Sequence, residues 1–337
     1  MSAILAEPDL SRYDAALSRH AAWLAALQDA DGLFRGESIS CGAYMPLPLY
    51  GQATGQHAMV ERAFHNLEAH YLRNGGLVQP EGVREMMPYI PAWIVMGAAL
   101  NENLRLRSVM LKHLLSFQDE AGGGFFGSVS ARDMGRGVVD FDSTTQACAA
   151  LCIAGSEAAA LKCGRYLRNF VQAQPDPSRR LFLQWDTSRG LILDFDSTKA
   201  TAHLLVYAEP RQHLYKIGLL ARAFAHLYGM TGEAAYLELA QSHYQKTAAA
   251  SPDIWTNTLA HKMAWAAWTL YLLTRRRSYA EDACRMADHL VSLQQADGGF
   301  AYPELWPSYD DVPMDFKVDI ASQFATWIFY ARTMAGF

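Results

Sequence analysis

One acidic pentapeptide occurs twice in the sequence and could carry acid–base chemistry. Asp-Phe-Asp-Ser-Thr fills residues 140–144 and again residues 194–198. Side chains two apart on an extended segment point to the same side, so each copy offers a pair of carboxyl groups. Two carboxyls that share a site with little water cannot both ionise easily, and the pKa of one rises. The four candidate acids are Asp140, Asp142, Asp194 and Asp196.

The first copy is the stronger candidate, because the glycine-rich stretches "GGGFFG" and "MGRGVV" give it a flexible approach. We expect Asp142 to be the general acid, which must stay protonated at neutral pH, and Asp140 to be the neighbour that raises its pKa. A structural role explains the same residues as well. Asp142, Ser143 or Thr144 can cap a helix, and duplication of a repeat can copy a cap.

A histidine stripe is the second chemical signal. Thr258, His261, Trp265 and Trp268 follow one another at helical spacing, which places them on one helix face. Facing a cavity, they supply a proton-transfer group, His261, and aromatic walls that stabilise cations or stack on sugar rings. The alternative is ordinary packing between helices.

Other aromatic and histidine side chains are candidate contacts to a ligand, since loops on a rigid frame usually carry binding residues. An aromatic-rich site flanked by acids suits an apolar or amphipathic organic molecule. The candidates for substrate binding are Tyr44, Tyr89, Trp93, His203, His213, Trp255, Trp265 and Trp306.

The elements that must position these residues are helices with apolar residues at i, i+3 and i+4. Segments with one charged face alternate with segments that are apolar all round, which is typical of surface and buried helices. Six of each kind predict six helical hairpins in a ring, an all-α (α/α)6 toroid that forms a single domain over residues 1–337. The predicted helices cover 9–28, 43–54, 57–73, 88–101, 103–118, 141–155, 157–174, 213–229, 233–249, 255–274, 278–295 and 317–335.

One insertion breaks the helical pattern. In "LFLQWDTSRGLILDF" two apolar runs flank a turn that ends in glycine. This text predicts a β-hairpin near residues 181–194, which leads directly into the second acidic copy.

Composition excludes several classes of protein. The 337 residues carry a net charge of −5 without a basic block, so we expect no nucleic-acid partner. No run of about 18 apolar residues predicts a membrane span, and the first residues lack the features of a secretory signal. The five cysteines are scattered, without a zinc pattern. We therefore expect a cytoplasmic protein with a small-molecule substrate and no metal or cofactor; the oligomeric state is left open.

Three predicted outer helices end in related text, "QDADGLF" from Gln28, "QDEAGGGF" from Gln118 and "QQADGGF" from Gln294. Such glutamine–glycine–aromatic loops in a helical ring resemble those of the superfamily of squalene cyclases and protein prenyltransferases. Asp-Phe-Asp-Ser-Thr resembles the Asp-x-Asp-Asp-Thr acids of class II terpene cyclases. The resemblance implies that Asp142 or Asp196 protonates an alkene or an epoxide.

A weaker resemblance points elsewhere. "HLYKIGLLARAFAHLYGMTGEAAYLELA", from His213, is similar to the hairpins of sugar 2-epimerases and six-hairpin glycosidases. These toroids bind polar sugars through histidine, tryptophan, arginine and carboxylate side chains. The matching residues would be Glu85, His203, His213, Trp255, His261, Asp310 and Asp311.

The leading hypothesis is an enzyme of the terpenoid-cyclase type. It would use an aspartic acid to cyclise, isomerise or dehydrate an apolar, isoprenoid-like molecule in a central cavity lined by aromatic side chains. The alternatives are a carbohydrate-acting toroid, either a sugar epimerase or a glycoside hydrolase, and a toroid that binds a ligand without catalysis. The lining of the ring separates them: apolar for a cyclase and polar for a sugar enzyme.

The three loop glutamines should be structural, because their amides can bond loop backbone beside a helix-ending glycine. Changing Gln28, Gln118 or Gln294 to alanine is expected to lower the melting temperature and to leave turnover per folded molecule nearly intact. Thermal unfolding and activity are measured on the same samples. A loss of rate without a loss of stability would contradict this.

Overall fold

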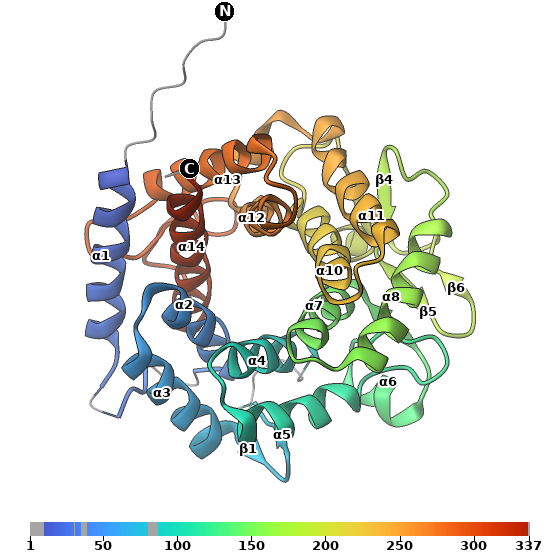
Figure 1. The fold of residues 1–337 in the computed structure, drawn as a ribbon, viewed down its shortest axis with the longest axis horizontal. Coiled ribbons are helices and arrows are strands. Elements are labelled where there is room, and N and C mark those ends of the chain that lie inside the picture. Colours follow the sequence, from blue (N-terminus) through green and yellow to red (C-terminus); the bar gives the residue numbers. More distant parts are fainter. Residues whose placement is uncertain (1–9, 30, 35–38, 80–86, 336–337) are drawn as a thin grey trace, which may run out of the picture.

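The computed structural model describes residues 10–29, 31–34, 39–79 and 87–335. Within them, two concentric sets of helices form the predicted (α/α)6 toroid (Figure 1). The inner helices are α2 (Leu47–Thr54), α4 (Tyr89–Leu100), α7 (Phe141–Ile153), α10 (Tyr215–Thr231), α12 (Lys262–Thr274) and α14 (Met314–Met334). The outer helices are α1 (Leu10–Leu27), α3 (His57–Asn66), α5 (Leu104–Leu115), α8 (Glu157–Gln172), α11 (Ala234–Tyr244) and α13 (Arg277–Ser292).

Burial follows the sequence pattern that predicted the two sets. The inner helix α4 carries no charged residue and buries eight residues in an unbroken run, Pro91 to Ala98. The outer helix α8 buries one stripe, including Cys163, Leu167 and Phe170, and turns its charged face outward. None of the described helices is long and apolar enough to cross a membrane.

The predicted β-hairpin is present and is part of a larger arrangement than expected. Strand β5 (Gln184–Asp186) pairs with β6 (Gly190–Leu191). It also pairs with β3 (Val138–Asp140), so that Val139 lies opposite Trp185. The insertion is therefore anchored to the segment that enters α7 and the first acidic copy.

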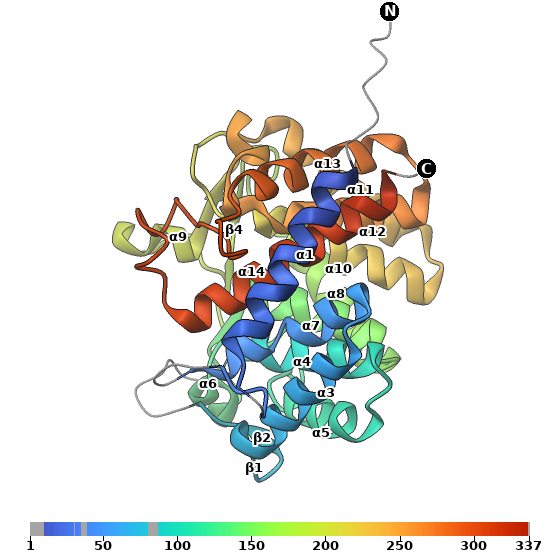
Figure 2. The same cartoon turned by 90° about the vertical axis from the view of Figure 1, so that its left-hand side faces the viewer.

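Further short elements lie outside the predicted pattern. Strand β4 (Arg180–Phe182) pairs with β7 (Leu204–Val206), and β1 (Leu72–Arg73) forms a hairpin with β2 (Gly76–Leu77). Two short helices, α6 (Val129–Met134) and α9 (Ala200–His203), interrupt the loops. In Figure 2, α9 and the segment that leads to α14 extend from the same side of the ring.

The predicted helix over 255–274 is wrong in its first part. Two 3₁₀ turns, Pro252–Trp255 and Thr258–Ala260, precede α12, which begins at Lys262. The Asn257 side chain accepts a hydrogen bond from the backbone of Leu259 and caps the second turn, a local bond that competes with a continuous helix. Thr258 therefore does not share a helix face with Trp265.

The loop glutamines lie where a structural role requires them. The Gln118 amide donates to the carbonyl oxygens of Gly123, at 3.0 Å, and Ala159, at 3.1 Å. Gln294 donates in the same way to Gly298 and Ala16, at 3.2 and 2.8 Å. Each amide closes its own loop and ties that loop to the next outer helix, α8 or α1.

The loop after Gln28 has the bond that closes the loop itself: the Gln28 amide donates to the carbonyl oxygen of Gly32 at 3.2 Å. The bond from Gln294 to Ala16 joins the last hairpin of the chain to the first and so closes the ring. The effect of the alanine variants on stability stays a prediction.

Gly298 tests this closure, because its backbone φ is +103° and an added Cβ would lie 2.3 Å from the carbonyl oxygen of Arg19 on α1. Gly232 is the matched control, with φ +72° and nothing within 4 Å. We expect Gly232→Ala to cost about 1–2 kcal/mol of unfolding free energy for its left-handed backbone. Gly298→Ala should cost clearly more in denaturant unfolding, because it also pushes α1 away. Equal costs would show that the contact with α1 is not tight.

Candidate active site

The first acidic copy spans the junction between strand β3 and helix α7. Asp140 is the last residue of β3, and its carboxylate accepts a hydrogen bond from the backbone N–H of Ser143 at 2.8 Å. Asp140 is therefore the helix cap, a role expected of its neighbours. Phe141 turns into the core, 5.6 Å from the ring of Phe170. Asp142 points the other way from the first turn of α7, toward α10.

Asp142 binds the first two residues of α10. The Lys216 ammonium lies 2.6 Å from both carboxylate oxygens of Asp142, and the Tyr215 hydroxyl donates to one of them at 2.7 Å. Burial opposes ionisation, but Lys216 and Tyr215 outweigh it and hold the pKa of Asp142 below its usual value. Burial and the charge of Asp142 raise the pKa of Asp140.

These shifts are the reverse of the expected ones. Asp142 is the ionised member of the pair and Asp140 the one that resists ionisation, because Lys216 of α10 forms its ion pair with Asp142. That either carboxyl takes part in catalysis stays a prediction.

The second copy is used differently. Asp194 is exposed. Asp196 is also exposed, and its carboxylate accepts hydrogen bonds from the backbone and hydroxyl of Thr198, which lower its pKa. Phe195 stacks on His203 at 4.9 Å between ring centres. Asp140, the first aspartate of its copy, caps a helix, whereas in the second copy the capping residue is the second aspartate, Asp196. The two copies are therefore not structural equivalents, and residues 194–198 lie in an exposed loop.

The start of α12 brings His261 and Lys262 to the same region. Trp327 of α14 donates its indole N–H to Nδ1 of His261 at 2.9 Å, and Nε2 of His261 lies 2.9 Å from Nζ of Lys262. Lys262 Nζ is 4.8 Å from the centre of the Tyr215 ring. Gly218 of α10 allows this approach, since a Cβ there would lie 2.8 Å from the carbonyl oxygen of Lys262.

Asp319, in the early part of α14, supplies a second carboxyl. It accepts a hydrogen bond from the Gln323 amide at 2.6 Å. Burial raises the pKa of Asp319, and the charge of Lys262 opposes the shift. Burial lowers the pKa of Lys262, against the charges of Asp319 and Asp142. Burial also lowers the pKa of His261, and Lys262 adds to that shift.

The loop before α14 covers one side of this group. Glu304 accepts hydrogen bonds from the backbone N–H of Thr258, at 3.0 Å, and from its hydroxyl. The ring of Tyr302 stacks on Phe324, which lies 5.2 Å from His261. Trp306 packs 4.5 Å from Phe316. These aromatic rings form a wall beside the charged residues.

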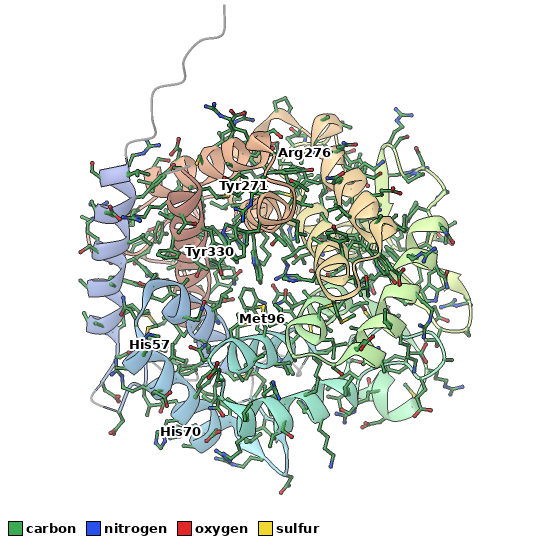
Figure 3. The ribbon with its side chains drawn as sticks, viewed as in Figure 1. His57, His70, Met96, Tyr271, Arg276 and Tyr330 are labelled. Carbon is green, nitrogen blue, oxygen red and sulfur yellow. The ribbon has the colours of Figure 1, made fainter. Side chains whose placement is uncertain are left out.

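Below the charged residues the ring is filled. Trp265 stacks on Trp327 at 4.6 Å and lies 5.0 Å from Trp93. The guanidinium of Arg222 lies 3.3 Å from the centre of the Trp265 ring. Figure 3 shows inner side chains filling the middle of the ring, with Met96 and Tyr330 at its inner edge. Side chains of the inner helices therefore occupy the middle of the ring beneath the charged residues.

The predicted ligand contacts divide into three groups, at the mouth of the ring, beneath the mouth and elsewhere in the molecule. Tyr89, half-buried at the start of α4, is influenced electrostatically by Asp319 and Asp142, and His213 lies 5.7 Å from the ring of Tyr215. With Trp306 and His261, they belong to the mouth. Trp93 and Trp265 form the floor.

Other candidates lie elsewhere. The buried Tyr44 hydroxyl accepts a hydrogen bond from the backbone of Phe34, and Trp255 packs against Arg285 of α13. His203 stays with the second acidic copy. Asp310 and Asp311 are exposed. Glu85 lies outside the described residues.

Sequence reasoning missed Lys216, Lys262 and Asp319. Lysine at the start of a helix opposes the helix dipole, and Lys216 and Lys262 both lie in the first turn of helices that are otherwise almost free of charge. Their place in the first turn of an almost uncharged helix was the sequence feature that could have identified the two lysines. Among the described residues, no group of three or more histidine, cysteine or acidic side chains could hold a metal ion.

Comparison with known proteins identifies the fold. No protein-family model and no curated protein matches the chain. A GH76 α-mannanase of Bacteroides thetaiotaomicron matches with TM-score 0.66 and 13% identity, over 96% of both chains. A D-mannose isomerase matches with TM-score 0.68 and 14% identity, over 97% of this chain and 99% of that one. A sugar epimerase from a ruminal bacterium matches with TM-score 0.64 and 13% identity, over 96% and 98%.

At these identities the likeness establishes the fold alone. All three are α/α toroid enzymes, which agrees with the weaker of the two sequence resemblances. The expected kinship with terpenoid cyclases and prenyltransferases is not supported, because the similar structures are a mannanase, a mannose isomerase and a sugar epimerase.

The Asp142–Lys216 pair allows a double-mutant test. Asp142→Asn leaves Lys216 buried without a counter-charge, and Lys216→Met does the reverse. Each should cost about 3 kcal/mol of unfolding free energy, the lower end for a buried pair, and the double variant should recover much of the loss. The pair's contribution is complete above the ordinary aspartate pKa and is lost as the pH falls through the lowered value in the folded protein. Additive losses in urea titrations would argue against coupling.

Proposed function

We propose that the protein is a carbohydrate-acting enzyme that moves protons on an open-chain sugar, as in aldose–ketose isomerisation or epimerisation beside the carbonyl group. The observation that carries this proposal is Lys262 beside His261 and under the influence of Asp319, with the pKa of the amine lowered and that of the acid raised. Groups whose environments push their pKa values toward neutrality can exchange protons with a substrate at pH 7.

The polar mouth supports a sugar over an isoprenoid. Asp142, Lys216, His261, Lys262 and Asp319 meet at the starts of four inner helices, where a cyclase would need apolar walls. Hydroxyl groups of a sugar can bond such side chains. The half-exposed aromatic Trp306 gives one sugar face a surface to stack on.

The similar solved structures also support this choice. They include a D-mannose isomerase and a sugar epimerase on the same fold. The substrate would be a small sugar, and a cytoplasmic location without nucleic-acid partners stays a prediction.

Glycoside hydrolysis is the second candidate, and one observation favours it. Asp142 and Asp319 have pKa shifts of opposite sign, and a glycosidase needs one ionised and one protonated carboxyl. The GH76 α-mannanase shares the fold. Against it, both oxygens of Asp142 already bind Lys216.

Proton exchange in heavy water tests the proposal. The protein is incubated with a panel of free aldoses and ketoses, and deuterium entering the carbon beside the carbonyl is followed by NMR together with isomer formation. Lys262→Met and Asp319→Asn should each slow exchange by about 10²–10⁴-fold, the usual contribution of a general acid or base. Gln118→Ala is the control variant and should exchange at the rate of the natural protein.

Release of reducing sugar from an α-mannan, with no deuterium incorporation into any free sugar, would replace this proposal with hydrolysis. Absence of both activities across the panel would remove the carbohydrate assignment.

A further inference from the structure

Two lysines at the mouth have similar burial and different partners. Lys216 and Lys262 are each 6% exposed and start neighbouring inner helices. Lys216 lies 2.6 Å from both oxygens of Asp142, with which it forms an ion pair. Lys262 forms no ion pair with any residue in the described part of the chain, and its hydrogen-bond partner is Nε2 of His261.

The hydrogen bonds of His261 decide the protonation of Lys262. An indole N–H can only donate, so Nδ1 of His261, which binds Trp327, carries a lone pair and no proton. The proton of a neutral imidazole then sits on Nε2. Nε2–H must donate to Nζ of Lys262, and only a neutral amine has the lone pair to accept it.

The surroundings favour the neutral amine. Lys262 is buried against the ring of Tyr215, and burial lowers its pKa. The positive charges of Arg222 and Lys216 act in the same direction, whereas Asp319 and Asp142 oppose it. The charge of Asp142 is largely neutralised by its contact with Lys216.

We propose that Lys262 is a carbonyl-reactive amine that forms an imine with the aldehyde of a small open-chain sugar. This deepens the proposed function and rests on it for the identity of the natural substrate. Nζ attacks the aldehyde carbon, the carbonyl electron pair moves to oxygen, and a carbinolamine forms after one proton passes from nitrogen to oxygen. Asp319 in its protonated form then gives a proton to the leaving hydroxyl, so that water departs and an iminium ion remains beside the Asp319 carboxylate.

The iminium ion would assist the proposed proton transfer. It draws electrons from the neighbouring C–H bond and so makes that proton more acidic. The carboxylate of Asp319, having lost its proton in the previous step, is then available as the base. Lys216 is not available for this step, because both oxygens of Asp142 bind its side-chain nitrogen.

Reductive trapping of the natural protein tests the proposal. Glycolaldehyde, a small aldehyde, is added at pH 7 with cyanoborohydride as the reductant, and the hydroxyethyl groups on each lysine are located by peptide mass spectrometry. An ordinary lysine, with a pKa near 10.4, is deprotonated in fewer than about one molecule in a thousand at this pH. Lys262 should therefore be labelled at least about tenfold faster than buried Lys216 and exposed Lys199 in the same molecules.

Its pH dependence is a second readout. Labelling of Lys262 should rise with pH and level off above its lowered pKa of about 8, whereas labelling of an ordinary exposed lysine keeps rising about tenfold for each pH unit up to about pH 10. Trp327→Phe removes the donor that fixes the histidine proton and should slow labelling of Lys262, with circular dichroism confirming that the variant is folded.

Labelling of Lys262 at the rate of Lys216, or with the pH dependence of Lys199, overturns the proposal. Trapping and deuterium exchange can fail separately. Exchange without trapping leaves the isomerase proposal with Lys262 as a simple base, and trapping without exchange leaves a reactive amine in a protein of another function.

Discussion

Gln294 donates from one side-chain amide to carbonyl oxygens of both its own loop and α1, and so joins the last hairpin of the chain to the first. The buried residues of all the hairpins form one hydrophobic core, and contacts between neighbouring hairpins hold the ring around it. Gln118 makes the same double contact between α5 and α8. These contacts tie the loop that follows one outer helix to the next outer helix around the ring.

The mouth gathers charges that a folded protein normally avoids burying. Lysine at a helix start faces the positive end of the dipole, and a buried charge needs a partner. The protein resolves this in two ways. Lys216 is neutralised by Asp142 from the adjacent helix. The ammonium or amine nitrogen of Lys262 lies 2.9 Å from Nε2 of His261, whose Nδ1 accepts a hydrogen bond from Trp327.

The aromatic layer beneath the mouth makes both arrangements rigid. Trp93, Trp265 and Trp327 pack on one another, and Trp327 also holds His261 by its indole N–H. The same side chain therefore packs in the middle of the ring and orients His261. Above this layer, the charged side chains come from α7, α10, α12 and α14.

The sequence by itself determined the periodic part of the protein. The alternation of charged-face and apolar helices predicted both sets of helices, the turn before Gly190 predicted the hairpin of β5 and β6, and the loop glutamines were recognised as structural. These features depend on residues close in the chain. They are decided by helical periodicity, turn chemistry and local hydrogen bonds.

Only the tertiary structure decided what the acidic residues do. Asp142 and Asp196 stand in identical pentapeptides, yet Asp142 meets Lys216 from 74 positions along the chain and Asp196 meets only Thr198 and solvent. Lys216 and Lys262 likewise look alike in sequence and differ in their partners, an aspartate for Lys216 and a histidine for Lys262. A pKa depends on burial and on the charges nearby, and in a ring of hairpins those neighbours are brought together by packing between distant segments.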